Sequence, residues 1–224
     1  MSKIRIITIG SVLVIGLALM LILPFMQNQL DDFGYTSDLT PVTLKLGTQS
    51  FNIPKAYLWY KPNWVGKTDN AIHMTVTLPN YLPYSEDTKV FYKGGPGLKY
   101  KLAIDLFKND SSTPPESIYF KAETLKNCEK KWGRYKVCPY LPQPGLFEVL
   151  VPENSDLPLA FVCPLVGTER SPFCKIQLSY NETIKLQLSM HEKQLMNADK
   201  IIPDVLSLLQ KFSVPQQMMR DRGG

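Results

Sequence analysis

The chain has 224 residues and a formal net charge of +5 at pH 7, with lysine and glutamate interspersed along it. So small an excess of positive charge argues against a dedicated nucleic-acid or acidic-lipid surface. The densest basic cluster is Lys130, Lys131, Arg134 and Lys136, and Glu129 stands directly beside it. We therefore predict no nucleic-acid partner.

The first hydrophobic stretch, residues 6–26, carries no charge, and only Thr8 and Ser11 in it are appreciably polar. As a helix it would extend about 30 Å, the thickness of the hydrocarbon core of a bilayer. It is apolar on every side, whereas a buried core helix shows polar residues on one face. The Gly-Leu-Ala at residues 16–18 is a candidate signal-peptidase site, but cleavage there would leave an apolar N-terminus. We predict an uncleaved transmembrane anchor, with a cleaved signal peptide as the alternative.

Charges on either side of this stretch orient it in the membrane. Lys3 and Arg5 precede it, and Asp31 and Asp32 follow it. The positive-inside rule then keeps residues 1–5 in the cytoplasm and places the remainder across the membrane. Without Lys3 and Arg5 that remainder has a net charge of +3. We predict a single-pass protein of the inner membrane, with most of the chain in the periplasm.

Four cysteines lie beyond the anchor, at positions 128, 138, 163 and 174. The spacing favours the local pairs Cys128–Cys138 and Cys163–Cys174, because each would close a short hairpin-like loop and stabilise it by about 2–3 kcal/mol. Zinc binding is the alternative, but it calls for closer pairs such as Cys-x-x-Cys. Disulfides imply an oxidising compartment, either a periplasm or a secretory lumen and cell surface.

Beyond a polar tether at residues 27–41, the chain is dominated by period-two alternation of apolar and polar residues, which is typical of half-buried strands. The clearest example is Ile72, Met74, Val76 and Leu78, with His73 on the other face. Turn residues separate the segments. We predict strands within residues 42–53, 72–78, 89–92, 98–106, 119–125, 137–140, 147–151, 159–163, 175–180 and 183–190.

The last element has a different period. Ile201, Val205, Leu208 and Phe212 recur at steps of four, three and four, which predicts one face of a helix that begins near Asp199 as N-cap. Pro215 would end it, and residues 215–224 would form a flexible tail. We predict an α+β fold for residues 42–214, mainly an antiparallel β-sheet with this C-terminal helix packed on one face.

The sequence offers little for catalysis. Its two histidines, His73 and His191, lack the spacing of a zinc site, and no Gly-x-Ser-x-Gly elbow occurs. We predict no catalytic residues, no metal and no cofactor. Two carboxylates that meet in space could still make a cell-envelope hydrolase, which stays as the alternative function.

Two groups of aromatic residues are candidate partner-binding sites. Trp59, Tyr60 and Trp64 form a cluster that could anchor a protein interface or could equally close the core.

The second group, Trp132, Arg134 and Tyr135, would sit at the tip of the loop that Cys128 and Cys138 close. A rigid loop presenting aromatic and basic residues is a plausible recognition element, and burial of Trp132 against the sheet is the alternative.

The segment Phe51-Asn52-Ile53-Pro54-Lys55-Ala56-Tyr57-Leu58 resembles small bacterial envelope proteins, as do residues 176–180 and 184–190 followed by a helix at 201–212. Some of these proteins are similar to immunity proteins encoded beside type VI secretion effectors. The resemblance implies a membrane-anchored periplasmic domain that binds and blocks a toxin and has no catalytic residues. We therefore expect a binding protein rather than an enzyme, whose partner is a toxin or another protein of an envelope complex.

Overall fold

The computed structural model describes residues 33–92, 95–109, 128, 130–140, 142–143, 145–153, 159–166 and 169–215. The predicted anchor at residues 6–26, the strand at 119–125 and the tail after residue 215 lie outside these residues. None of the helices within them has the length and apolar character needed to cross a membrane. The anchor therefore stays a prediction.

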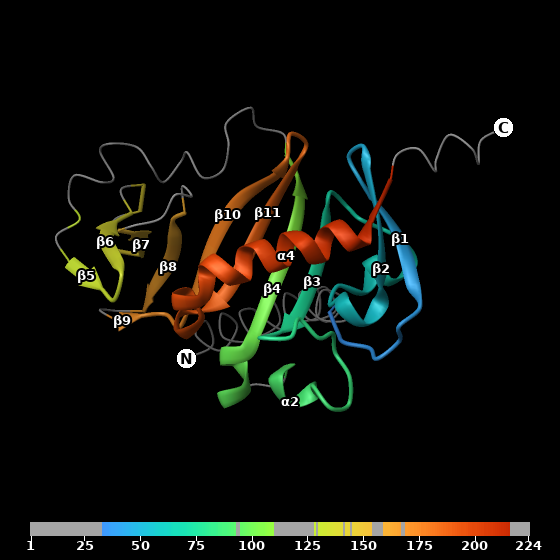
Figure 1. The fold of residues 1–224 in the computed structure, drawn as a ribbon, viewed down its shortest axis with the longest axis horizontal. Helices are drawn as coiled ribbons and strands as arrows, with labels where there is room; N and C mark the ends of the chain where they lie inside the picture. Colours follow the sequence, from blue (N-terminus) through green and yellow to red (C-terminus); the bar gives the residue numbers. More distant parts are fainter. Residues whose placement is uncertain are drawn as a thin grey trace, which may run out of the picture. The chain divides into compact units, whose positions relative to one another are not determined.

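A nine-stranded antiparallel sheet forms the body of the domain (Figure 1). Its strands pair in the order β3–β4–β11–β10–β8–β7–β6–β5, and β9 pairs with β8. The strands are β3 (Ala71–Thr77), β4 (Lys101–Lys108), β5 (Lys130–Trp132), β6 (Tyr135–Pro139), β7 (Phe147–Pro152), β8 (Phe161–Val166), β9 (Glu169–Arg170), β10 (Phe173–Asn181) and β11 (Ile184–His191).

A second, three-stranded sheet pairs the first two strands of the domain with its last strand. Its order is β1–β2–β12, with β1 (Pro41–Leu46), β2 (Gln49–Pro54) and β12 (Ser213–Val214). The single strand region predicted for residues 42–53 is thus a hairpin, which turns at Gly47 with φ of +60°. Glycine adopts this left-handed conformation without the steric penalty of a side chain.

Short helices occupy residues that we predicted to form two strands. Residues 89–92 form the helical turn α2 (Lys89–Tyr92), because Ser85 and Thr88 bond to each other's backbone amides and start a helical turn there. The strand predicted from residue 98 begins only at Lys101, since Pro96 opens the 3-10 helix η3 (Pro96–Tyr100). The other 3-10 helices of the described residues are η1 (Lys55–Tyr57), η2 (Lys61–Val65) and η5 (Glu192–Asn197).

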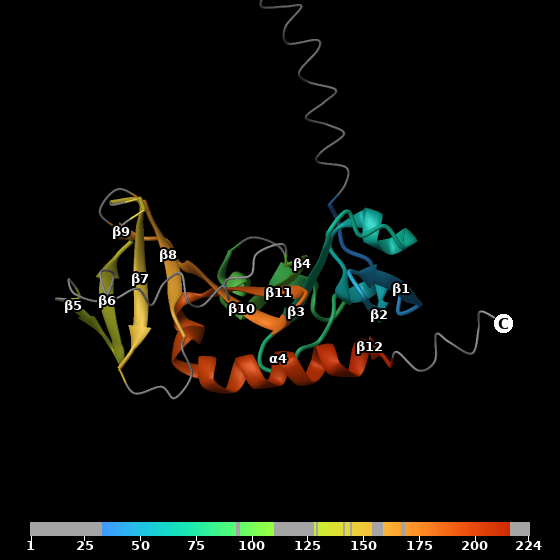
Figure 2. The same ribbon diagram turned by 90° about the horizontal axis from the view of Figure 1, so that it is seen from above.

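Helix α4 (Ala198–Phe212) covers one face of the large sheet and crosses β10, β11, β4 and β3 (Figures 1 and 2). Its buried stripe of Ala198, Ile201, Ile202, Val205 and Leu209 belongs to one hydrophobic core with the inward side chains of these strands. The main architecture is therefore the predicted one, an antiparallel sheet with a C-terminal helix on one face.

The N-cap of α4 is not the predicted residue. Asn197 occupies that position and makes no side-chain capping bond, while Asp199 lies in the first turn. The 3-10 helix η5 leads directly into α4, so the helix has a preceding turn instead of a free end. The Asp199 carboxylate is paired with Arg134 in the turn between β5 and β6.

Both predicted disulfides are present, Cys128–Cys138 and Cys163–Cys174. The second links β8 to β10 and both of its cysteines are fully buried in the main core. The first lies in a smaller cluster formed by Cys138, Val149, Val151 and Ala160.

This difference in packing predicts unequal effects of removing the two bridges. Their sequence separations are 10 and 11 residues, so the loop-closure contribution is about 3 kcal/mol for each. Cys163→Ala with Cys174→Ala should additionally remove contacts of the main core and lower the melting temperature more than Cys128→Ala with Cys138→Ala. Thermal unfolding of the two double variants measures this. Equal melting temperatures would contradict the assignment of Cys163–Cys174 to the main core.

Candidate functional site

The surface of β3, β4, β11 and β10 that faces away from α4 is the first candidate site, and we call it the open face. Along β11, Ile184, Leu186, Leu188 and Met190 are buried on the side of α4, and the residues between them are only half-buried. The strand register brings the corresponding residues of the four strands into line. The open face consists of His73, Thr75, Ala103, Asp105, Phe107, Phe173, Lys175, Gln177, Ser179, Lys185, Gln187, Ser189 and His191.

A row of four polar side chains crosses the open face. The register places His73 opposite Asp105, Asp105 opposite Gln187, and Gln187 opposite Gln177. His73 Nδ1 lies 2.8 Å from Asp105 Oδ1, and Gln177 Nε2 donates to Gln187 Oε1 at 3.0 Å. These contacts hold the side chains of the row in defined positions, as recognition of a partner requires.

Aromatic rings surround the His73 end of this row. The ring centroids of Trp59, Tyr60 and Phe107 lie 5.5, 5.4 and 5.9 Å from the imidazole centroid. The backbone N–H of Trp59 donates to the backbone carbonyl of His73 at 3.2 Å, which holds Trp59 there. Two of the aromatic residues predicted to bind a partner, Trp59 and Tyr60, thus border the open face and are half-buried.

Trp64 differs from Trp59 and Tyr60. Its ring packs against the main core, and its indole Nε1 donates to the Leu58 carbonyl at 2.9 Å. These contacts give Trp64 a structural role in η2, which the alternative interpretation of the cluster anticipated. Whether Trp59 and Tyr60 bind a partner stays a prediction.

The next row of the open face has small side chains at its inner positions. Lys175 stands opposite Ser189, Ser189 opposite Ala103, and Ala103 opposite Thr75. Ser189 and Ala103 are half-buried, whereas Lys175 is exposed. Thr75 is 1% exposed, and its Oγ1 has no hydrogen-bond partner among the described residues.

A basic pocket of about 310 Å³ adjoins the open face where β10 begins and β11 ends. Lys99, Lys193, His191 and Phe173 line it together with Pro96 and other residues. Burial lowers the pKa of His191 below its usual value, and the nearby Lys193 and Lys99 lower it further, whereas Glu192 opposes them. The imidazole is therefore mostly neutral at pH 7, and the lysines supply the positive charge.

The disulfide-closed hairpin of β5 and β6 is not the exposed recognition loop that we expected. Tyr135 is fully buried, and its hydroxyl donates to the Leu195 carbonyl in η5, so it cannot contact a partner. Arg134 pairs with Asp199 in the first turn of α4, which raises the pKa of the guanidinium. At the turn, a Cβ on Gly133 would meet the side chain of Met196. The tip of this hairpin is thus docked on the start of α4.

Trp132 is half-buried beside this contact. Its ring centroid lies 5.9 Å from that of Tyr135, and the Arg170 guanidinium lies 5.2 Å above the ring. Arg170 in turn donates through Nε and Nη2 to Glu148 Oε2, at 3.1 and 2.7 Å. Cation–π stacking and a charge-assisted hydrogen bond thereby fix Trp132 within the domain.

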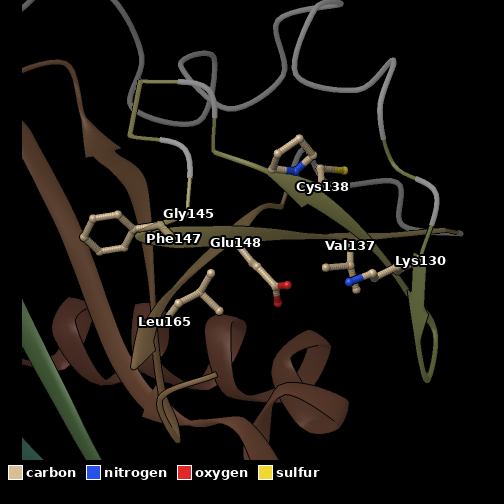
Figure 3. A pocket seen from close by; sticks show the side chains of 8 residues that line it. Lys130, Val137, Cys138, Gly145, Phe147, Glu148 and Leu165 are labelled. Carbon is tan, nitrogen blue, oxygen red and sulfur yellow. The ribbon is translucent and has the colours of Figure 1, made fainter. Parts of the chain in front are cut away.

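Glu148 also lines a second pocket, of about 290 Å³, between β5, β6, β7 and β8 (Figure 3). Figure 3 shows Lys130, Val137 and Leu165 around the same space. The pocket is mostly apolar, and its carboxylate is already bound to Arg170. It could receive an apolar side chain, and Glu148 is the one carboxylate among its described lining residues.

Among the described residues, the partly buried carboxylates Asp105, Glu148 and Asp204 do not form an acidic catalytic pair, because each is bound to a basic group. Asp105 is bound to His73, Glu148 to Arg170, and Asp204 to Lys200. No hydroxyl or thiol bonds to His73 among the described residues, so the His73–Asp105 pair lacks a nucleophile there. Nor do three or more potential metal ligands gather anywhere in the described ranges.

The docked hairpin predicts a stability effect. Tyr135→Ala should destabilise the domain by about 3–5 kcal/mol, because it removes a buried ring and its hydrogen bond. Lys136→Ala, an exposed neighbour on the same strand, is the control and should change stability little. Urea unfolding measures both. A Tyr135→Ala protein as stable as the control would show that the hairpin tip is not docked.

The basic pocket predicts the titration of His191. NMR titration of its ring should give a pKa below the ordinary value of about 6.5. Lys193→Gln should raise that pKa and Glu192→Gln should lower it. Because the folded pKa lies below the unfolded one, the contribution of His191 to stability is complete above about pH 6.5 and declines as the pH falls. A pKa at or above 6.5 would contradict the placement of His191 beside the two lysines.

Comparison with known proteins relates the fold to one solved structure. The sequence matches no protein-family model, and no curated protein sequence matches it. The structure is similar to that of Smlt3025, an immunity protein of the Stenotrophomonas maltophilia type IV secretion system, with a TM-score of 0.51 and 12% sequence identity. The match covers 79% of this chain and 94% of the other. At this identity the likeness shows a shared fold.

Proposed function

We propose that this protein is an immunity-type binding protein, anchored in the inner membrane, whose periplasmic domain binds and neutralises a secreted toxin. The observation that carries the proposal is the fold match, which extends over 94% of a protein described as an immunity protein. That protein belongs to a type IV secretion system, so the match does not support the association with type VI secretion that the sequence resemblance implied. The proposal concerns toxin neutralisation and leaves the type of secretion system open.

The disposition of the carboxylates favours binding over the alternative of an envelope hydrolase. Asp105 and Glu148 are each engaged by a basic group on the same chain, so neither is placed as a general acid or as a nucleophile. The open face instead presents hydrogen-bonding side chains on a rigid sheet, with Trp59 and Tyr60 at its border. Such a surface suits recognition of another protein.

The two disulfides support the proposed location. Each joins cysteines that are half-buried or fully buried, and such bonds form and persist in an oxidising compartment. An apolar segment at residues 6–26 that is preceded by Lys3 and Arg5 would deliver the domain to the periplasmic side.

A protection assay tests this function. The toxin would be chosen among proteins encoded beside the gene and directed to the periplasm of a host cell. Co-expression of the full chain should restore growth, and the purified chain should bind the toxin with a Kd in the nanomolar range. A variant without residues 1–26 should remain in the cytoplasm and fail to protect.

Two controls complete the assay. A catalytically inactive toxin shows that growth inhibition depends on toxin activity. Replacement of residues 1–26 by a cleavable signal peptide separates export from anchoring, because it delivers the domain without a membrane segment. The proposal would be wrong if the full chain neither bound nor neutralised any of the neighbouring toxins.

A further inference from the structure

The chemistry of the open face identifies the kind of partner surface that fits it. We infer that the open face docks an acidic segment of a protein partner, with Lys175 and Lys185 as cations on opposite sides of the polar row and the basic pocket beyond Lys175. The inference rests on the proposed function in one respect, namely that the partner is a protein.

The positive charges of this region are not neutralised within the domain. Lys175 and Lys185 project from β10 and β11 on the open face, and Lys99 and Lys193 line the adjoining pocket. None of these four lysines makes an ion pair within the part of the chain that the structure describes. Other basic side chains do form ion pairs with carboxylates there, and these are Lys55, Lys89, Lys131, Arg134, Arg170 and Lys200.

Negative charge is scarce on the same surface. Among the described residues, the one carboxylate that projects from the open face is Asp105, which His73 engages at 2.8 Å and whose side chain is 10% exposed. Glu192 acts on His191 with the opposite sign to Lys99 and Lys193, and of these three residues only the two lysines are among the described residues that line the pocket. The surface therefore has an excess of cations that carboxylates of a partner can neutralise.

The hydrogen-bonding groups of the open face suit a polypeptide. The row of Lys175, Ser189 and Ala103 lies between the polar row and the basic pocket. In the polar row, Gln177 and Gln187 carry amide groups that can bond a peptide backbone, while the lysines bind its carboxylates. An anionic lipid surface would use the lysines but would leave the amides without a role.

Binding of a defined probe tests the inference directly. The probe is a fluorescein-labelled peptide of ten glutamates, and fluorescence anisotropy measures its binding to the full chain in a neutral detergent. Wild-type protein should bind at 50 mM salt and should lose most of its affinity at 300 mM salt, because the contacts are electrostatic. Lys175→Glu with Lys185→Glu should weaken binding at least tenfold.

Matched variants separate this surface from charge in general. Lys45→Glu with Lys211→Glu changes the net charge equally at two exposed lysines, on β1 and on α4. It should change the affinity less than twofold. Lys175→Gln with Lys185→Gln is a second variant that adds no negative charge, and it should give an intermediate loss. Melting temperatures show whether each variant is folded.

Three outcomes would overturn the inference. The first is the absence of probe binding by folded wild-type protein, and the second is an equal loss of affinity in the Lys45 and Lys211 control. The third is displacement of the probe by phosphatidylglycerol vesicles but not by phosphatidylcholine vesicles, which would assign the face to a membrane. If the full chain binds the toxin and protects against it, yet Lys175→Glu with Lys185→Glu leaves toxin affinity unchanged, the inference fails and the proposed function stands. Absence of any toxin binding by the wild type refutes the proposed function itself.

Discussion

Burial of one stripe of α4 against the inward side of the large sheet is the interaction on which the rest of the domain depends. The five buried residues of the helix share a core with strands β3, β4, β11 and β10. At its first turn the helix meets the β5–β6 hairpin, where Arg134 pairs with Asp199. At its end it continues into β12, and Ser213 pairs with Phe51 of β2. A single helix thus connects the central strands to both outer parts of the fold, so the hydrophobic effect along it stabilises all three.

The same packing determines which surface is left for a partner. Successive residues of a strand point to opposite sides of the sheet, so the residues that alternate with the buried ones must face away from α4. On β11 these are Lys185, Gln187 and Ser189, and on β10 they include Lys175 and Gln177. Fixed on rigid strands, these groups lose little freedom when a partner docks, and that lowers the entropic cost of association.

Sequence patterns predicted the parts of the fold that depend on local periodicity. Alternation identified β1, β3 and β11, the three-four spacing identified α4, and the short separations of the cysteines identified both disulfides. The candidate site was harder to predict from the sequence, because its contacts join segments that are far apart in the chain. His73 and Asp105 are 32 positions apart, and Arg134 and Asp199 are 65 apart.

The predicted exposure of Tyr135 was wrong, although the sequence contained a pattern that indicates its burial. Tyr135 alternates with Val137 on β6, and both are buried, so the apolar period that identified other strands also predicted an inward Tyr135. The short loop between the cysteines suggested an exposed tip instead. That the tip would dock on η5 and α4 could not be deduced, because it depends on where those elements lie in space.

Because α4 follows every strand of the large sheet, the inward face of the sheet has no cover until residues 198–212 have been synthesised, and β2 lacks its second neighbour until β12 follows. The domain therefore cannot complete its core before that segment has been made. A domain whose core stays open for this long can still pass through a translocation channel as an unfolded chain, whereas an early-folding domain of the same size would be blocked there.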